Sequence, residues 1–287
     1  MRFQFIAAEK AHYPVQVLCR CLGVTRSGFY AWRQRPLSAR AQEDARLLRR
    51  VQLAHAESRR TYGRPRLVKA LRAAGIPIGG KRVARLMRSA GLVARGRRRF
   101  RRSTVVDATA TFAPNRLRRR FTSRRRRRPV WAADITTCWT REGWCYLAVV
   151  LDLASRAVVG WAVRRDLTTD LPRQALERAL AQTTRWPRLH HSDRGTQYTS
   201  AAYGAVLAQH HIVVSMSRRG NCWDNAPVES FFSTLKAEAW PDQPWRDVDD
   251  AIAAIADYIR FYNTRRLHSA LGYLSPVAFA ASCAHAL

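Results

Sequence analysis

Residues 130–136 read VWAADIT, an apolar stretch that is interrupted by one acid, Asp134. Valine, tryptophan and isoleucine favour extended backbone, so this stretch predicts a buried strand. A carboxylate among buried apolar side chains is costly unless it is paired, hydrogen-bonded or bound to a metal ion. Asp134 is therefore the first candidate functional residue of the chain.

The sequence around this strand predicts an α/β domain over residues 129–287. Strands are predicted at 130–136, 143–153, 157–163, 188–192 and 212–216. Helices are predicted at 171–183, 200–210, 225–239 and 248–261. Three strands in meander order, followed by alternating helices and strands, are typical of an α/β layer built on a mixed sheet.

Two further acids are candidates for the same site as Asp134. Asp193 comes directly after a predicted short strand and before a glycine turn, where catalytic groups of α/β sheets are often found. Glu229 lies on the helix predicted at 225–239, with Asp224 as a nearby rival and Glu238 as a distant one. Three carboxylates could hold two Mg²⁺ ions, for which Mn²⁺ can substitute, because hard cations prefer oxygen ligands. Such a pair activates a water or a 3′-hydroxyl for in-line displacement at phosphorus.

The charge balance points to a nucleic-acid partner. Lys and Arg total 51 against 20 Asp and Glu, which gives a formal net charge of +31. An excess of this size favours a polyanion, because phosphate contacts release counterions and supply affinity that does not depend on sequence. A solvated surface enriched in Arg by genome composition alone would normally carry balancing acids.

The first part of the chain, residues 1–93, predicts a helical DNA-binding region. Two short helix patterns separated by a glycine-containing turn outline a helix-turn-helix over about 62–91. Arg82 and Arg85 lie on its second helix, where a reader of the major groove needs donors. An ordinary basic helical hairpin is the alternative.

Residues 94–128 are interpreted as an arginine-rich linker. From residue 91 to residue 128 the chain has 15 Arg and one acid, Asp107. Like charges at this density repel, so we expect an extended or weakly helical arm that becomes ordered on a DNA backbone. Its five consecutive arginines are Arg124, Arg125, Arg126, Arg127 and Arg128.

Cysteine usage and hydropathy argue against a secreted or membrane protein. The six cysteines include no C-x-x-C pair, and no apolar run is long enough to span a bilayer. The sequence therefore predicts a cytoplasmic, nucleoid-associated protein with no membrane partner.

Several motifs together resemble insertion-sequence transposases of the IS-three type, within the DDE and retroviral-integrase-like superfamily. The three acidic motifs of that family are similar to residues 131–152, 191–198 (HSDRGTQY) and 223–232 (WDNAPVESFF). Asp193 and Glu229 are separated by the 35 residues that the family shows. Motifs of its OrfB reading frame are similar to residues 18–32, 62–66, 82–87 and 262–273.

The resemblance implies a ribonuclease-H-like catalytic core in which Asp134, Asp193 and Glu229 bind the metal ions. It also implies strand cleavage at the ends of an insertion sequence, followed by transfer of the 3′-hydroxyl to target DNA. Double-stranded DNA, a second copy of the chain and an OrfA fusion or partner are the expected partners. Expected DNA contacts, besides the arginines named above, are Lys236, Arg194 and Arg265.

Two alternatives remain open at the level of sequence. A catalytically silent DNA-binding regulator of transposition would use the helix-turn-helix alone, although it would not need three acids at this spacing. A nuclease that hydrolyses DNA without joining it would use the same carboxylates. The first acidic motif also has Ala133 where the family often has threonine, a position peripheral to metal binding.

Overall fold

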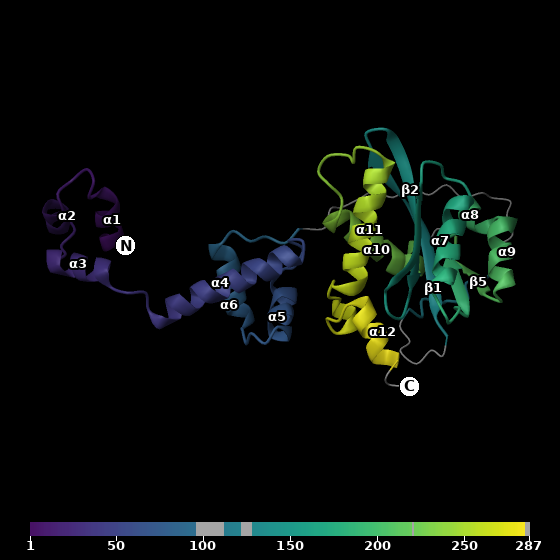
Figure 1. Cartoon of the computed structure of the whole chain (residues 1–287), viewed down its shortest axis with the longest axis horizontal. Coiled ribbons are helices and arrows are strands. Elements are labelled where there is room, and N and C mark those ends of the chain that lie inside the picture. Colours follow the sequence, from purple (N-terminus) through teal and green to yellow (C-terminus); the bar gives the residue numbers. More distant parts are fainter. Residues whose placement is uncertain (96–111, 122–127, 220, 285–287) are drawn as a thin grey trace.

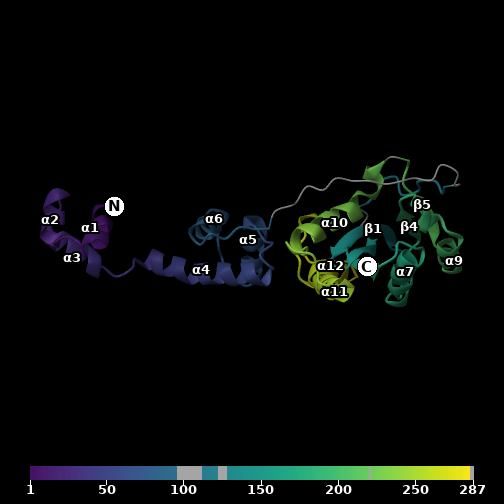
Figure 2. The same ribbon diagram turned by 90° about the horizontal axis from the view of Figure 1, so that it is seen from above.

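The computed structural model describes residues 1–95, 112–121, 128–219 and 221–284, and begins with a small three-helix unit. Its helices are α1 (Arg2–Glu9), α2 (Val15–Cys21) and α3 (Arg26–Gln34). They pack around a core of their own, made of Ile6, Leu18, Cys19 and Phe29. Figures 1 and 2 show this unit standing apart from the rest of the chain.

The second helical unit contains the predicted helix-turn-helix. It comprises α4 (Ala39–Glu57), α5 (Arg64–Ala73) and α6 (Gly80–Ser89). Gly75 between α5 and α6 has a φ of +76°, a conformation that glycine adopts without the Cβ penalty of other residues. The region predicted over 1–93 is thus composed of two units with separate cores.

The predicted mixed sheet is confirmed, with five strands in the order β3-β2-β1-β4-β5. The strands are β1 (Val130–Thr140), β2 (Gly143–Asp152), β3 (Val158–Arg164), β4 (Leu189–Ser192) and β5 (Val213–Met216). The meander β1-β2-β3 is antiparallel, whereas β4 is parallel to β1 and β5 is parallel to β4. The carboxyl ends of β1 and β4 therefore point the same way.

Helices cover both faces of this sheet, as Figure 2 shows. The α/β half of the chain is called the catalytic half, after the role that the sequence predicts for it. Its helices are α7 (Asp170–Ala181), α8 (Thr196–Thr199), α9 (Ala201–Gln209), α10 (Ala226–Glu238), α11 (Val248–Thr264) and α12 (Pro276–Ala284), with 3-10 turns η1 (Cys222–Asn225) and η2 (Ser269–Leu271). Side chains of β1 alternate between the two cores: Ala132 joins the core that contains α10 and α11, and Ala133 joins the core of α7 and α9. Alternation therefore places Asp134 on the α10 side.

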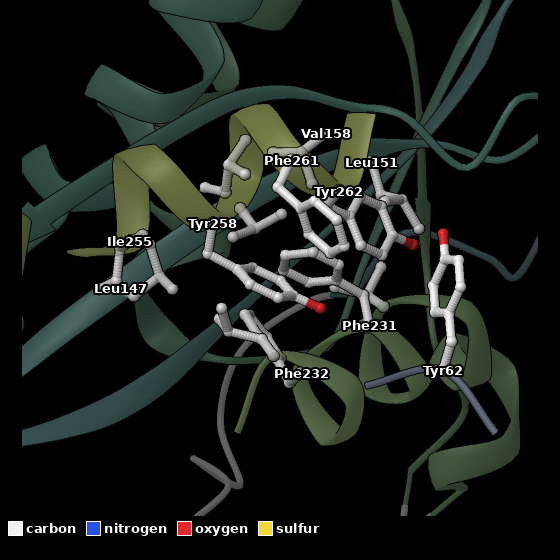
Figure 3. Close-up of a cluster of buried hydrophobic side chains, with 14 of the residues drawn as sticks. Tyr62, Leu147, Leu151, Val158, Phe231, Phe232, Ile255, Tyr258, Phe261 and Tyr262 are labelled. Carbon is white, nitrogen blue, oxygen red and sulfur yellow. The ribbon is translucent and has the colours of Figure 1, made fainter. Parts of the chain in front are cut away.

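The α4–α6 unit docks on the catalytic half through Tyr62. Its hydroxyl accepts a hydrogen bond from the Leu267 backbone N–H at 2.7 Å and donates one to the Arg265 carbonyl at 3.1 Å. Figure 3 shows Tyr62 beside the aromatic cluster that includes Phe231 and Tyr262. One continuous hydrophobic cluster runs from α4–α6 into α10 and α11.

The described part of the predicted linker differs from an extended arm. Within residues 112–121, Leu117 is only 3% exposed, and the backbone N–H groups of Arg116 and Leu117 donate to the Ser215 hydroxyl at 3.0 and 3.2 Å. This segment packs on the catalytic half because it carries apolar side chains among its arginines. In the described part of the chain, no helix is long and apolar enough to cross a bilayer.

Candidate active site

The sheet register brings Asp134 and Asp193 together. Ala132 of β1 pairs with His191 of the parallel strand β4. Asp134 follows Ala132 by two residues, and Asp193 follows His191 by two residues. Residues at equal offsets on adjacent parallel strands stay neighbours at the same end of the sheet. Each carboxylate also accepts a nearby backbone N–H, from Ile135 at 2.9 Å and from Gly195 at 3.0 Å.

Helix α10 begins beside the same point of β1. The side chain of Asn225, at the start of the helix, donates from Nδ2 to the carbonyl of Ala133 at 3.1 Å. Glu229 follows four residues later, about one turn along the helix, and therefore lies on the same helix face as Asn225. The third candidate acid is thus carried by a helix whose N-cap residue is hydrogen-bonded to the residue before Asp134.

The electrostatics agree with this placement. Burial raises the pKa of Asp193, and the Gly195 N–H opposes that shift. The pKa of the Tyr198 hydroxyl is raised by its burial, by Tyr203, and then by both Asp134 and Asp193. Within the described residues this buried hydroxyl has no hydrogen-bond partner. Both aspartates therefore lie near one buried polar atom.

Lys236 on α10 lies near the same site. Burial lowers the pKa of its ammonium, while the Cys138 thiol and then the Asp134 carboxylate oppose the shift. The ammonium also lies 5.8 Å from the centre of the Trp240 ring. Lys236 lies seven positions after Glu229, so both side chains share one face of α10. The expected proximity of this lysine to the carboxylates is therefore consistent with its surroundings.

The donor set suits a divalent cation. Carboxylate oxygens are the ligands that Mg²⁺ and Mn²⁺ prefer, and a nearby cation would offset the burial that raises the pKa of Asp193. Across residues 1–95, 112–121, 128–219 and 221–284, no three acidic, histidine or cysteine side chains are already grouped as metal ligands. Binding of an ion would therefore require the three carboxylates to draw together.

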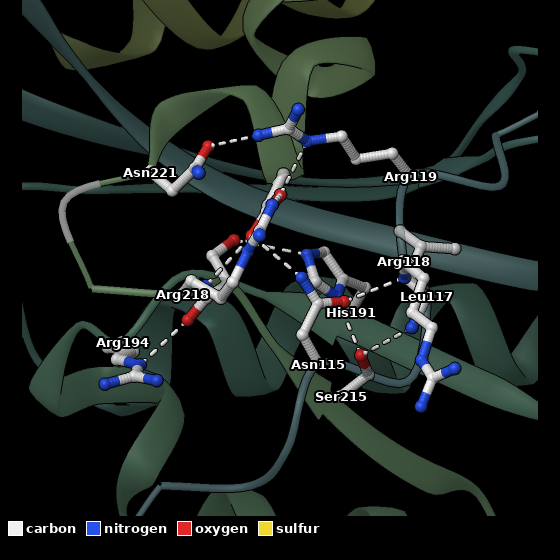
Figure 4. A network of polar contacts seen from close by, with 11 residues as sticks. Asn115, Leu117, Arg118, Arg119, His191, Arg194, Ser215, Arg218 and Asn221 are labelled. Atoms are coloured by element: carbon white, nitrogen blue, oxygen red, sulfur yellow. Dashed lines mark hydrogen bonds and ion pairs between the residues drawn. The ribbon is translucent and has the colours of Figure 1, made fainter.

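The rival acid Asp224 has a different role. It is completely buried and bonded to Arg218, Arg119 and Asn115 (Figure 4). The hydrogen bonds from Arg218, together with those from Arg119, hold the pKa of Asp224 well below its ordinary value. The other rival, Glu238, pairs with Arg266 at 2.6 Å. The sequence contains no signal for Arg119 and Asn115, which lie 105 and 109 residues away from Asp224 along the chain.

The arginines of α6 are engaged within the protein. Arg82 Nε and Arg85 Nη2 pair with the two carboxylate oxygens of Asp44 on α4, at 2.8 and 2.7 Å. Both side chains thus form a bridge between α6 and α4 in the unbound chain. To contact DNA as predicted, both arginines would have to release Asp44 and bind a phosphate or a base instead.

The other predicted DNA contacts lie at scattered positions. Arg194 donates from Nε to the Ser217 carbonyl at 2.8 Å, and its guanidinium lies 4.5 Å from the Phe112 ring centre. Arg265 is exposed at the end of α11, and Arg128 is exposed before β1. The remaining members of the arginine run lie outside the described residues: Arg124, Arg125, Arg126 and Arg127.

A buried histidine supports the strand that leads to Asp193. His191 contacts the Ser215 hydroxyl through Nδ1 at 2.9 Å and the Ser217 hydroxyl through Nε2 at 3.1 Å. Burial lowers its pKa to about 4, against a weaker opposing effect of Asp224. The imidazole is therefore neutral at physiological pH and acts as a cross-strand tie between β4 and β5.

Two families of known proteins match different parts of the chain. Residues 124–222 and 210–276 match the family described as Integrase core domain, and residues 42–100 match the HTH-like domain family. The 31 kDa protein of insertion element IS600 from Shigella sonnei is 42% identical over 91% of this chain and 97% of its own length. The protein thus combines an integrase-type catalytic core, with its ribonuclease-H-like fold, and a helix-turn-helix-like domain.

The particular family follows from a second relative. Transposase InsF for insertion sequence IS3A of Escherichia coli K12 is 40% identical over 97% of this chain and 98% of its own length. The chain belongs to this family of insertion-sequence transposases, as the acidic motifs indicated. It is a DNA transposase, and the silent-regulator alternative is not favoured.

Proposed function

We propose that this transposase cleaves DNA strands at the ends of an insertion sequence and joins the 3′-hydroxyl to target DNA at Asp134, Asp193 and Glu229. The pairing of Ala132 with His191 between β1 and β4, two residues before Asp134 and Asp193 respectively, carries this proposal. The hydrogen bond from Asn225 to the Ala133 carbonyl supports the inclusion of Glu229, because it ties the start of α10 to the residue before Asp134.

The three carboxylates are suited to hold two Mg²⁺ ions, or Mn²⁺ in their place. Bound there, the ions would activate the attacking oxygen and stabilise the leaving oxygen. The chain's own residues orient the carboxylates: the Ile135 and Gly195 N–H groups each fix one oxygen of an aspartate. Lys236, on the same face of α10 as Glu229, would contact a phosphate of the terminal DNA strand.

The proposed partners are the terminal repeats of the element and the target duplex. The net charge of +31 supports contact with phosphates, for which Arg194, Arg265 and the run Arg124–Arg128 are candidates. The helix-turn-helix would contribute Arg82 and Arg85 once they exchange Asp44 for DNA. Because two ends must be joined, we propose at least a dimer on DNA, with an upstream OrfA segment as fusion or partner.

Cleavage and joining of labelled element ends in Mg²⁺ or Mn²⁺ test this proposal. Asp193→Asn should bind DNA as well as the wild type does but lose at least a hundredfold in cleavage rate, because one metal ligand loses its charge. Asp249→Asn, the same change at an exposed position of α11, is the matched control and should react normally.

Four outcomes would count against the assignment. Retention of cleavage by Asp193→Asn would remove this residue from the site. Cleavage that persists in a chelator would exclude a divalent ion. If wild type binds ends but never reacts, even with the upstream frame product supplied, the DNA-binding regulator becomes the better account. Hydrolysis without joining would favour the nuclease.

A further inference from the structure

Asp224 is a buried carboxylate whose hydrogen-bonding capacity is already filled. It accepts from the backbone N–H, Nε and Nη2 of Arg218, from Nε of Arg119 and from Nδ2 of Asn115, at 2.8 to 3.0 Å. These five donors match or exceed the roughly four lone-pair positions that a carboxylate offers. Two guanidinium groups also neutralise its charge, so Asp224 has no oxygen left for a metal ion.

Two of these donors come from residues 112–121, which we call the strap. The strap is bonded to Ser215 by two backbone N–H groups and buries Leu117 against the catalytic half. Its Arg118 and Arg119 both have positive φ, at 48° and 56°, which is unfavourable for residues with a Cβ. Strained backbone persists where surrounding contacts hold it, and strain of this kind concentrates at functional sites.

The contacts of Asp224 connect the strap to the candidate active site. Asp224 precedes Asn225, which is the N-cap residue of α10 and donates to the carbonyl of Ala133, the residue before Asp134. Arg119 reaches the same stretch a second time, because its Nη2 donates to the Asn221 side chain at 2.8 Å. Figure 4 shows Arg119 and Asn115 converging with Arg218 on this loop. The strap therefore holds both ends of the turn that precedes the helix of Glu229.

We propose that the strap, acting through Asp224, positions the start of α10 and thereby sets Glu229 against the two aspartates. This inference rests on the proposed role of Glu229 in catalysis. Asp224 and Arg119 are then positioning residues that never touch the substrate. The segment between the helix-turn-helix and the core would thus be part of the catalytic machinery in addition to joining the two.

Cleavage of labelled element ends by the full chain tests the strap, with Arg119→Ala, Asp224→Asn and the double variant compared. Each single variant should slow cleavage about tenfold while the affinity for DNA changes less than twofold, because small displacements of a catalytic group are costly. The double variant should be no slower than the slower single one, because both changes break one contact. Arg116→Ala is the control for lost charge. Arg116 is an exposed arginine of the strap, and within this network it forms a hydrogen bond only through its backbone N–H.

Hydrogen exchange supplies a readout that does not depend on catalysis. Arg119→Ala should speed exchange at the amides of Arg218 and Asp224, which donate to Asp224 and Asn221, with no change in β2. Exchange that rises everywhere would mean general destabilisation and would overturn the proposal. Arg119→Lys, which can restore one charged hydrogen bond, should recover part of both effects.

Other results distinguish this proposal from a direct role of Asp224 in the reaction and from a wrong assignment of the triad. If Asp224→Asn abolishes cleavage while Arg119→Ala leaves it and the loop exchange unchanged, Asp224 acts on the reaction directly and the strap proposal fails. Multiplicative effects in the double variant would also refute it. Glu229→Gln is run beside them: if it cleaves normally, the proposed triad is wrong, while the exchange data still report on the strap.

Discussion

Replacing Glu238 by glutamine should destabilise the protein strongly without touching the active site. Glu238 and Arg266 are 7% and 4% exposed, and the guanidinium binds both carboxylate oxygens, at 2.6 and 2.7 Å. Burial alone lowers the pKa of Arg266, but Glu238 reverses this and raises it above the ordinary value. Glutamine leaves the guanidinium charged in the core without its counter-ion, a change that typically costs about 3–5 kcal/mol. The Tyr258 hydroxyl, 2.8 Å from Oε2, keeps an acceptor only if the amide oxygen faces it.

Equilibrium unfolding of the full chain in urea measures this loss. Glu177→Gln on the surface of α7, where Glu177 pairs with Arg173 and is 43% exposed, is the control and should change stability by less than about 0.5 kcal/mol. Glu238→Leu combined with Arg266→Met should recover most of the loss, because an apolar pair leaves no buried charge. A loss of less than about 1 kcal/mol in the free energy of unfolding for Glu238→Gln would refute the reasoning. So would a double variant whose loss equals the sum of the losses of its two single variants.

Two other predictions concern stability. Burial, followed by the charges of Arg266, Arg66 and Arg156, lowers the pKa of His268 from 6.5 to about 3. Its neutral form therefore stabilises the fold fully above pH 6.5, and this contribution falls by up to about 1.4 kcal/mol per pH unit as the pH drops toward 3. Urea midpoints of His268→Asn should depend less on pH over that range; an unchanged dependence would contradict the assignment. Gly160→Ala should cost about 3 kcal/mol, because its Cβ would lie 2.2 Å from the Ala175 carbonyl of α7. Gly204→Ala, with open space around it in α9, should instead raise the midpoint slightly, and equal losses for both would show that helix packing is not the cause.

The catalytic half was largely predictable because its signals are local. Strand and helix periodicity located all five strands, and Asp134 within one strand and Asp193 just after another stood out against their apolar neighbours. The register that joins Asp134 to Asp193 could be inferred only in outline, since pairing of β1 with β4 depends on contacts across almost 60 residues. Sequence identified the correct elements but not their exact alignment.

The strap and the ion pairs were not predictable for the opposite reason. Repulsion among 15 arginines suggests an extended segment, yet the buried Asp224 that accepts Arg119 is 105 residues away along the chain. Arg82 and Arg85 likewise fitted a groove-reading helix, while their partner Asp44 lies on a helix about 40 residues earlier. Counting charged residues indicates whether a surface is positive or negative. The ion-pair partner of each arginine depends on the tertiary fold.

The docking of Tyr62 has a consequence for how the chain is made. Its two hydrogen-bond partners lie 203 and 205 residues downstream. At a translation rate of about 5–20 residues per second, α4–α6 leave the ribosome roughly 10–40 seconds before the segment that Tyr62 binds. The aromatic face around Tyr62 must stay open during this interval and closes only when the last helices emerge. A nascent chain stalled before residue 265 would therefore leave the Tyr62 hydroxyl without these two partners, so a unit made early is docked by residues made about 200 positions later.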